Sequence, residues 1–278
     1  MHYSIVRELS HPASPHEVTL ARGAAEDAVV LKRLRASHRE RDDLALRLEL
    51  EATVLSELGG QRGVVRLAAL ERSPLTIIME YVSGGSLADR VRDVRDRQIG
   101  MPLARVLDVS GGILEALGHL HAHDVVHRDV KPSNILFDGD GTVRPIDFGV
   151  AARADPGRGG LLYGLPPDWI EERVGTMPYA APETVREPSG PATAAQDVYG
   201  AAVVVYEMLA GAAPWNLTPG ERPESFVERL ECEWEDNGLP EIPGVDPQVV
   251  QALSLALHPD PRRRLGSARE LATRLGLS

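Results

Sequence analysis

The sequence predicts an α+β protein built as two unequal lobes, a small β-rich lobe followed by a larger helical one. Residues 1–82 contain short runs of strand-forming residues around one helical stretch. After the turn at Gly84-Gly85, long segments with apolar residues at helical spacing predominate. This change of pattern places the boundary between residues 82 and 83, so that residues 1–82 and 83–278 form the two lobes of one domain.

The small lobe is predicted to hold one helix against several short strands. In residues 42–58, Leu50, Val54, Leu55 and Leu58 fall on one face of a helix. Short runs of apolar and β-branched residues, bounded by turn-forming residues, predict strands. The expected strands are residues 18–20, 28–32, 64–69 and 75–81.

The larger lobe is predicted to be mostly helical. Four segments show an apolar face at the helical period. They are residues 103–121, 196–209, 246–257 and 267–275. Strands are scarce, and the clearest pair is residues 134–137 and 143–146, which flank Asp138-Gly139-Asp140-Gly141 and are expected to form a hairpin. Because ligands commonly bind between two such lobes, we expect the functional site in that cleft.

Composition argues against several classes of protein. The formal net charge of −11 disfavours a nucleic-acid binder, which would normally display a basic face. The single Cys232 cannot form an intrachain disulfide and fits a reducing compartment. The most apolar stretch, residues 198–214, is interrupted by Glu207 and is short for a membrane span. We therefore expect a cytoplasmic protein with no membrane span and no nucleic-acid partner.

The two lysines are the most informative residues of the chain. Of 30 basic residues, 28 are arginine, and the two lysines are Lys32, at the end of a predicted strand, and Lys131, in the loop after a long helix. Asp129 and Asn134 flank Lys131, and Asp147 follows the predicted hairpin. Carboxylate and amide oxygens suit Mg²⁺, and compact ammonium groups suit phosphate oxygens. The pattern therefore predicts phosphoryl transfer.

These residues belong to an ordered series of motifs that resembles the bacterial eukaryotic-type (Hanks-type) serine/threonine protein kinases over essentially the whole chain. The motifs are AVVLKRL (28–34), LTIIMEYVSGGSL (75–87), HRDVKPSN (127–134), DFG (147–149), GTMPYAAPE (175–183), DVYGAAVVVYEMLAGAAPW (197–215) and HPDPRRRLGSARELA (258–272). The resemblance implies the bilobal protein kinase fold. It also implies ATP and Mg²⁺ or Mn²⁺ as cofactors, and transfer of the γ-phosphate to serine or threonine hydroxyls of a protein substrate.

The resemblance assigns roles to the residues that match its catalytic motifs. It implies that Asp129 is the base that accepts the proton of the substrate hydroxyl, and that Lys131 contacts the γ-phosphate. Lys32 reaches the α- and β-phosphates. Thr176 resembles the residue that contacts the catalytic aspartate and lysine in serine/threonine kinases.

Other matches imply structural support. Glu51 is expected to pair with the strand lysine, because Leu55 follows it at the apolar spacing that the pattern requires. Asp197 is expected to brace the catalytic loop. Glu183 is expected to pair with an arginine, for which Arg264 is the candidate.

The resemblance also implies the ligand contacts. Asn134 and Asp147 are the expected metal ligands, and Met79 is the residue at the back of the adenine site. The nucleotide-contacting residues expected on this basis are Val18, Val30, Lys32, Met79, Glu80, Val82 and Leu136.

One departure from the family pattern leaves alternatives open. The stretch that should carry the phosphate-covering G-x-G-x-x-G motif, residues 9–18, has no glycine and contains Pro12 and Pro15, which lack N–H donors. A pseudokinase that acts as a binding or scaffolding module is the main alternative. A small-molecule phosphotransferase of the aminoglycoside type is another, although Lys131-Pro132 and Thr176 favour a protein substrate.

Regulation is expected to differ from the family pattern as well. Arg128 resembles the arginine that grips an activation-segment phosphate, yet residues 150–175 contain one hydroxyl side chain, Tyr163. We therefore expect activation without phosphorylation of this segment. Glu171 or Glu172 would supply the anion to the arginine, or an activating partner or homodimer would order the segment.

Overall fold

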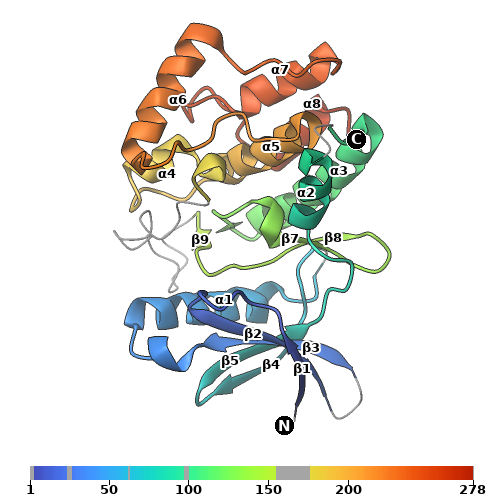
Figure 1. The fold of residues 1–278 in the computed structure, drawn as a ribbon, viewed down its shortest axis with the longest axis vertical. Helices are drawn as coiled ribbons and strands as arrows, with labels where there is room; N and C mark the ends of the chain where they lie inside the picture. The colour runs from blue at the N-terminus through green and yellow to red at the C-terminus, as the bar shows by residue number, and fades with distance from the viewer. Residues whose placement is uncertain (1–2, 24–26, 62, 97–99, 155–175, 278) are drawn as a thin grey trace.

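The computed structural model places the strands of the first eighty residues and α1 (Asp42–Leu58) at one end of the molecule, and the helices that follow residue 86 at the other (Figure 1). It describes residues 3–23, 27–61, 63–96, 100–154 and 176–277. The predicted α+β fold with two unequal lobes is confirmed. The predicted boundary between residues 82 and 83 falls in the connection that follows the last strand of the large sheet.

The small lobe is a five-stranded antiparallel sheet. Its strands, in spatial order, are β1 (Ser4–Glu8), β2 (His16–Arg22), β3 (Ala28–Leu34), β5 (Leu75–Glu80) and β4 (Leu67–Arg72). The register pairs Val18 with Lys32 and Lys32 with Ile77. Because side chains alternate along a strand, this register places Lys32 and Val18 on the same face of the sheet.

The first strand was not expected from the sequence. All five residues of β1 are exposed, so it lacks the alternation of buried and exposed positions that marks a half-buried strand. Ile5 and Val6 remain exposed at this edge of the sheet. The predicted strand at residues 64–69 is also shifted, because Val64 and Val65 are buried ahead of β4 rather than within it.

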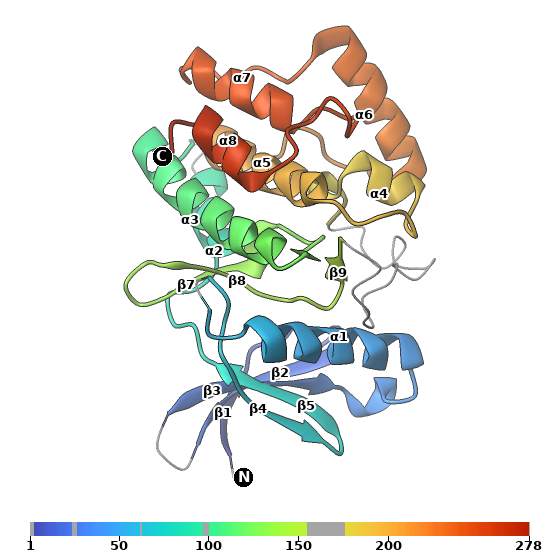
Figure 2. The ribbon, with the colours of Figure 1, turned by 180° about the vertical axis from the view of Figure 1, so that it is seen from behind.

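Helix α1 (Asp42–Leu58) has the bounds that the sequence predicts and lies between the sheet and the larger lobe (Figure 2). Leu48, Val54 and Leu55 of this helix are buried in the main core together with Ile77. Asp42 and Asp43 in its first turn are favourable next to the helix N-terminus. A short 3-10 helix, η1 (Ala36–His38), connects β3 to this part of the chain.

The larger lobe is built around one buried helix. Helix α5 (Ala194–Ala210) is buried along its whole length except at its two terminal alanines, which explains why its sequence is apolar on every face. A capping box formed by Thr193 and Gln196 starts the helix, and Gly211 ends it with a left-handed backbone (φ 80°). In the described part of the chain, no helix is long and apolar enough to cross a membrane.

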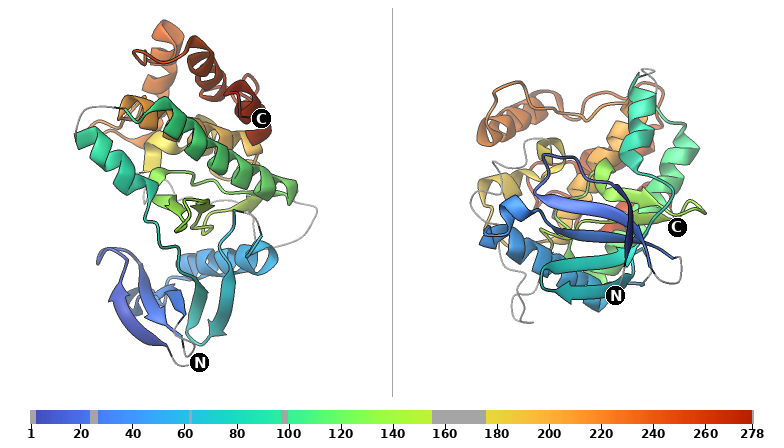
Figure 3. Two further views of the ribbon diagram at one scale, coloured as in Figure 1. Left: turned by 90° about the vertical axis from the view of Figure 1, so that its right-hand side faces the viewer. Right: turned by 60° about the horizontal axis from the view of Figure 1, so that its bottom comes forward.

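In the part of the larger lobe that the structure describes, six further helices accompany α5. They are α2 (Leu87–Asp96), α3 (Leu103–Ala122), α4 (Pro182–Arg186), α6 (Pro223–Asn237), α7 (Pro247–Ala256) and α8 (Ala268–Arg274). Of these, α3, α7 and α8 pack against α5. The left view in Figure 3 shows α3 running across the larger lobe. This helix packs against the short strands of residues 125–126 and 143–145. The predicted α3, α5, α7 and α8 are confirmed within a few residues, but α2, α4 and α6 were not predicted. Charged residues make α2 and α6 polar overall, and α4 is only five residues long.

A small hairpin, a second two-stranded sheet and a turn position the loops that face the small lobe. Strands β7 (Ile135–Phe137) and β8 (Val143–Pro145) pair as predicted, and β6 (Val125–Val126) pairs with β9 (Ala152–Arg153). The short 3-10 helix η2 (Pro132–Asn134) precedes β7. The segment between β6 and β7 is therefore fixed at both ends by strands, and it contains the HRDVKPSN motif.

Candidate active site

The first cluster of the site joins the two lobes through Lys32. The Nζ of Lys32 lies 2.6 Å from Oε2 of Glu51 and 2.9 Å from Oδ1 of Asp147. Lys32 and Glu51 are 7% and 2% exposed, so this is a buried ion pair. Burial alone would lower the pKa of Lys32, but the carboxylates of Asp147 and Glu51 outweigh it and raise that pKa above its ordinary value. The lysine is therefore a fixed positive charge.

A second cluster lies on the loop between β6 and β7. The Nζ of Lys131 donates to Oδ2 of Asp129 at 2.9 Å and to Oγ1 of Thr176 at 3.0 Å. The Nδ2 of Asn134 donates to the backbone oxygen of Asp129 at 3.0 Å and to its Oδ2 at 2.7 Å. The carboxylate of Asp129 is thus held by an ammonium and an amide, which fixes its orientation next to the lysine.

Asp197 of α5 holds this loop from below. Its carboxylate accepts hydrogen bonds from the backbone N–H groups of His127 and Arg128 at 2.8 and 2.7 Å, and from Nε2 of His121 at 2.8 Å. Asp197 is fully buried. Burial would raise its pKa, but the hydrogen bond from His121 and the other donors lower that pKa below its ordinary value. This is the bracing role that the sequence predicts.

Two residues of the site have a strained backbone, as expected where surrounding contacts hold the chain in place. Arg128 and Asp147 have φ angles of 64° and 67°, in the left-handed region that non-glycine residues rarely adopt. Such strain persists where surrounding contacts enforce it. The Nε2 of His127 donates to the carbonyl of Ile146 at 3.0 Å, and its ring packs on that of Phe148 at 5.0 Å between centroids. The loop and the DFG segment are therefore held against each other.

A cavity of about 310 Å³ opens between the lobes at Lys32. All seven residues that the sequence predicts as nucleotide contacts line it, together with Glu51, Asn134 and Asp147. Tyr81, which lies between the expected contacts Glu80 and Val82, also lines it. The wall residues that the sequence did not identify are Leu9, Ser10, Val65 and Ile146. The walls are mainly apolar near the end of β5, where the chain passes from the small lobe to the larger one, and charged near Lys32. A nucleotide with an apolar base and anionic phosphates requires such a distribution.

Strand β5 is held at its last residue, Glu80, by two hydrogen bonds. The N–H of Glu80 donates to the carbonyl of Arg66 at 3.0 Å, and its carboxylate accepts from the N–H of Arg66 at 2.9 Å. Val82 lies beyond the end of β5 and, among the described residues, takes part in none of the backbone hydrogen bonds outside strands. Val82 lines the cavity at this point.

The residues at the charged end fit a divalent cation. Both side-chain hydrogen bonds that Asn134 forms with described residues use its Nδ2, so its Oδ1 is the atom that could bind a cation. The side chain of Asp147 is 38% exposed and open to the cavity. In the described ranges, no group of three or more His, Cys, Asp and Glu residues forms a complete metal site. A carboxylate and an amide oxygen next to a phosphate-sized space are typical of Mg²⁺, which takes its remaining ligands from water and phosphate.

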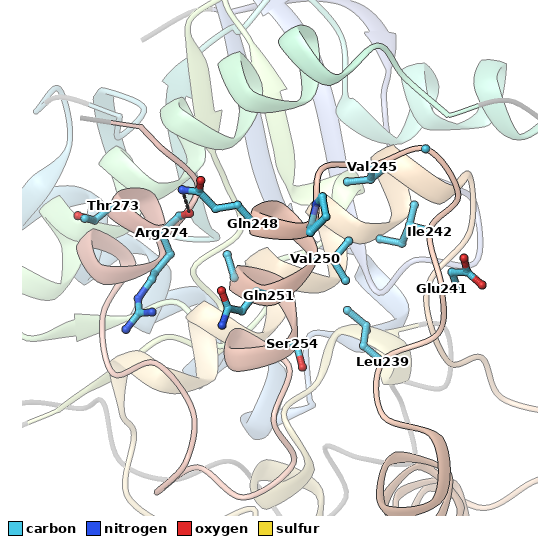
Figure 4. Close-up of a pocket in the computed structure, with 13 residues that line it drawn as sticks. Leu239, Glu241, Ile242, Val245, Gln248, Val250, Gln251, Ser254, Thr273 and Arg274 are labelled. Atoms are coloured by element: carbon cyan, nitrogen blue, oxygen red, sulfur yellow. Dashed lines mark hydrogen bonds between the residues drawn. The ribbon is translucent and has the colours of Figure 1, made fainter.

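A larger hollow lies away from these clusters, between α7, α8 and the segment before α7 (Figure 4). It measures about 1070 Å³ and is lined mainly by Ile242, Val250, Gln248 and Gln251. In Figure 4, Gln248 points to the backbone of Arg274, to which its Nε2 donates at 3.4 Å. This hollow holds no cluster of catalytic side chains, so we place the active site at the interlobe cavity.

The remaining predicted contacts have mixed outcomes. Arg264 forms a bidentate ion pair with Glu183 at 2.7 and 2.9 Å, as predicted. The Nη2 of Arg128 donates to the carbonyl of Pro188 at 3.1 Å. Glu171, Glu172, Tyr163 and the segment that contains them lie outside the described residues, so the expectations about activation remain predictions.

The fold and these clusters define the class of protein. A family model described as "Protein kinase domain" matches residues 16–274, and the chain belongs to this family. The match begins at residue 16, within the glycine-free stretch of residues 9–18.

Named relatives give the same answer. The chain is 32% identical to the serine/threonine-protein kinase PkaB of Streptomyces coelicolor, over 98% of this chain and 64% of that protein. It is 33% identical to the serine/threonine-protein kinase PknA of Corynebacterium glutamicum, over 70% of this chain and 38% of that protein. It is 30% identical to the CBL-interacting serine/threonine-protein kinase 16 of Arabidopsis thaliana, over 86% of this chain and 49% of that protein. The chain thus spans between about a third and two thirds of the length of these relatives.

Proposed function

We propose that the chain catalyses ATP-dependent phosphoryl transfer to serine or threonine hydroxyls of protein substrates. One observation carries the proposal: Lys32, Glu51 and Asp147 line the interlobe cavity of about 310 Å³ together with Asn134. The Nδ2 of Asn134 donates to the carboxylate of Asp129, which also accepts a hydrogen bond from Lys131. An arrangement of two ammonium groups, three carboxylates and an amide serves transfer of an anionic group better than it serves binding alone. It therefore favours an enzyme over a pseudokinase.

The proposed roles follow from the contacts. Lys32, held by Glu51, would bind the α- and β-phosphates. Asn134 and Asp147 would hold Mg²⁺ or Mn²⁺, which supplies charge neutralisation at the phosphates. Asp129, held by Lys131 and Asn134, would orient the substrate hydroxyl and accept its proton.

The acceptor site is proposed on the far side of Lys131. A hollow of about 430 Å³ is lined there by Lys131, Ser133, Thr176, Tyr179 and Glu207. It is open to solvent and adjoins Thr176, so an extended peptide segment could bring a hydroxyl to Asp129. The names of the relatives, which are serine/threonine-protein kinases, support a protein substrate over a small-molecule one. A cytoplasmic location, where ATP is abundant, belongs to the same proposal.

The test uses Asp129→Asn, with Asp108→Asn on the exposed face of α3 as the matched control. Intact mass after incubation with Mg-ATP and a generic basic protein should show phosphate on the substrate or on the chain itself. Asp129→Asn should lower the rate by about 10²–10⁴-fold, as loss of a general base does, while calorimetry shows unchanged ATP binding. Full activity in this variant would refute the mechanism. A wild-type protein that binds ATP and transfers nothing would be a pseudokinase.

A further inference from the structure

The glycine-free loop that covers the cavity is closed by its own hydrogen bonds. The N–H groups of Leu9 and Ser10 donate to the carbonyl of Val18 at 2.8 and 3.3 Å. The N–H of Val18 donates back to Oγ of Ser10 at 3.1 Å. At the loop tip, the N–H of Ser14 donates to the carbonyl of His11 at 2.9 Å. The two ends and the tip of the loop are thus connected internally.

The remaining donors of the loop are used in the same way. The N–H of Ala13 donates to Nδ1 of His11 at 3.2 Å, and the N–H of His16 donates to Oγ of Ser14 at 3.2 Å. The two loop prolines have no N–H. A glycine loop presents free N–H groups to phosphate oxygens, whereas here most of these donors already have partners inside the loop.

Arg35 fastens this loop from outside. Its Nε donates to the carbonyl of Ser14 at 2.8 Å, and its Nη2 donates to the carbonyl of His11 and to Oγ of Ser10, each at 3.2 Å. The same Nη2 contacts the carboxylate of Glu8. One guanidinium therefore contacts the start, the middle and the tip of the loop.

The position of Arg35 connects the loop to the phosphate end of the cavity. Arg35 directly follows β3, the strand that carries Lys32, and its own N–H donates to the carbonyl of Pro15 at 2.9 Å. Leu9 and Ser10, at the other end of the loop, line the cavity. Arg35 therefore fixes the position of the loop over the cavity relative to the strand that carries Lys32.

We propose that Arg35 is a positioning residue for nucleotide binding, which holds the glycine-free loop as a preformed roof over the phosphate end of the cavity. In this arrangement the loop is shaped before the nucleotide arrives, and the phosphates are bound by Lys32 and the metal ligands rather than by loop N–H groups. The expected effect of Arg35 on ATP binding and KM rests on the proposed function. The effect of Arg35 on the shape of the loop does not depend on it.

The chemistry of the side chain explains why arginine stands there. Guanidinium has donors spread over a planar fork, so it can bind several acceptors at once, while a lysine ammonium is a single compact centre. An isolated surface ion pair contributes little to stability. Two of the acceptors of Arg35 are main-chain carbonyls of the loop itself, so the contact constrains the backbone and not only a pair of side chains.

The first measurement is amide hydrogen exchange of the nucleotide-free full chain, followed on peptides that cover residues 8–18. Arg35→Ala should raise the exchange rates of the loop by about tenfold or more, because local opening controls exchange. Arg33→Ala is the matched control, since Arg33 is the neighbouring arginine of β3 and forms a similar bidentate ion pair with Glu17, which lies beyond the loop tip. It should leave the exchange of residues 9–15 unchanged.

The second measurement is ATP affinity by calorimetry, with KM and kcat where transfer is observed. Arg35→Ala should weaken ATP binding and raise KM by roughly tenfold, equivalent to about 1.4 kcal/mol, while kcat stays within about twofold, since the base and metal ligands are unaffected. Arg35→Lys should fall between Arg35→Ala and the wild type in both readouts, and it keeps the test valid if the alanine variant folds poorly.

Two outcomes would overturn the inference. One is wild-type exchange in the loop of Arg35→Ala, which would mean that the loop holds its shape without the arginine. The other is faster exchange with unchanged ATP affinity, which would separate the loop from nucleotide binding. A wild-type chain that binds ATP without transferring phosphate would refute the proposed function alone, because exchange and affinity still test the role of Arg35.

Discussion

Two loops face the interlobe cavity, and they are held in opposite ways. The catalytic loop, residues 127–134, is held from the core by the buried carboxylate of Asp197, which accepts two backbone N–H groups. The loop of residues 9–17 is held from the surface by Arg35, whose side chain is 22% exposed. The first loop carries the residues proposed for chemistry, and the second roofs the nucleotide space.

The difference in burial predicts a difference in energy. Removing one partner of a buried hydrogen-bonded charge leaves polar groups unsatisfied, which costs several kcal/mol. Contacts of a partly exposed arginine are screened by water and are each worth less. We infer that the catalytic loop is a rigid part of the fold, while the covering loop is the part whose shape can be altered without unfolding the protein.

The largest effect should come from Asp197→Asn. An amide at this position must turn an N–H₂ group or a single oxygen toward two N–H donors, so at least one buried donor loses its partner. The unfolding free energy should fall by about 3 kcal/mol in urea denaturation at pH 7, and activity should be lost with it. Asp236→Asn, at the exposed end of α6, is the control. A variant as stable as the wild type would mean that the core does not brace the loop.

Asp197 also determines the direction in which acid changes the stability of the fold. The pKa of Asp197 is lowered in the folded state, so its contribution to stability is present above the unfolded pKa of about 3.8. That contribution is lost as the pH falls through the folded value.

An intermediate effect is expected for Lys32→Arg. The ammonium of Lys32 lies between two carboxylates at 2.6 and 2.9 Å, a geometry that the larger guanidinium cannot reproduce. Loss of one or two charge-assisted hydrogen bonds should weaken Mg-ATP binding by about one to two decades. Arg33→Lys, on the outer face of the same strand, should bind as the wild type does. Calorimetry that showed equal affinities for Lys32→Arg and wild type would place the phosphates elsewhere.

The smallest effect concerns His16, which follows the loop tip at the start of β2. Burial, with the charge of Lys32 adding to it, lowers the pKa of His16 to about 4, while Asp147 opposes the shift and Arg47 and His38 favour it. The unfolded chain therefore binds this proton at a higher pH than the folded one does, and stability is lost as the pH falls from 6.5 towards 4.

The measurement compares unfolding free energies at pH 7 and pH 5. His16→Gln should reduce the pH dependence by on the order of 1–2 kcal/mol, because the other eight histidines are common to both proteins. An unchanged difference between the two pH values would show that the imidazole is solvated rather than enclosed beneath the loop.

The two loops also differ in how far the sequence predicts them. The catalytic loop is marked by HRDVKPSN, because its chemistry fixes residue types at fixed spacing, and the structure brings Asp129, Lys131 and Asn134 together. Glu51 was chosen from the apolar spacing of its helix, and it lies 2.6 Å from Lys32. Such local rules predict what a segment presents to a site.

The covering loop follows no such rule. The sequence shows that glycine is missing and that N–H donors are fewer, but Arg35 is one of 28 arginines and nothing local distinguishes it. Its contacts depend on how β2 and β3 pair, which brings residues 8–15 next to residue 35. Strand β1 was missed for a related reason, since an exposed edge strand is defined by its partner and not by its own pattern.

The location of the lysines has a practical consequence for observing this protein. The only two lysine side chains of the chain lie on opposite sides of the active site, Lys32 buried in the cleft and Lys131 next to the acceptor hollow. Isotope labelling of lysine would therefore give an NMR spectrum with two side-chain amine signals, one for each half of the reaction. ADP, which lacks the γ-phosphate, would shift the first signal and a peptide acceptor the second, so the two binding events could be followed separately without introducing any probe.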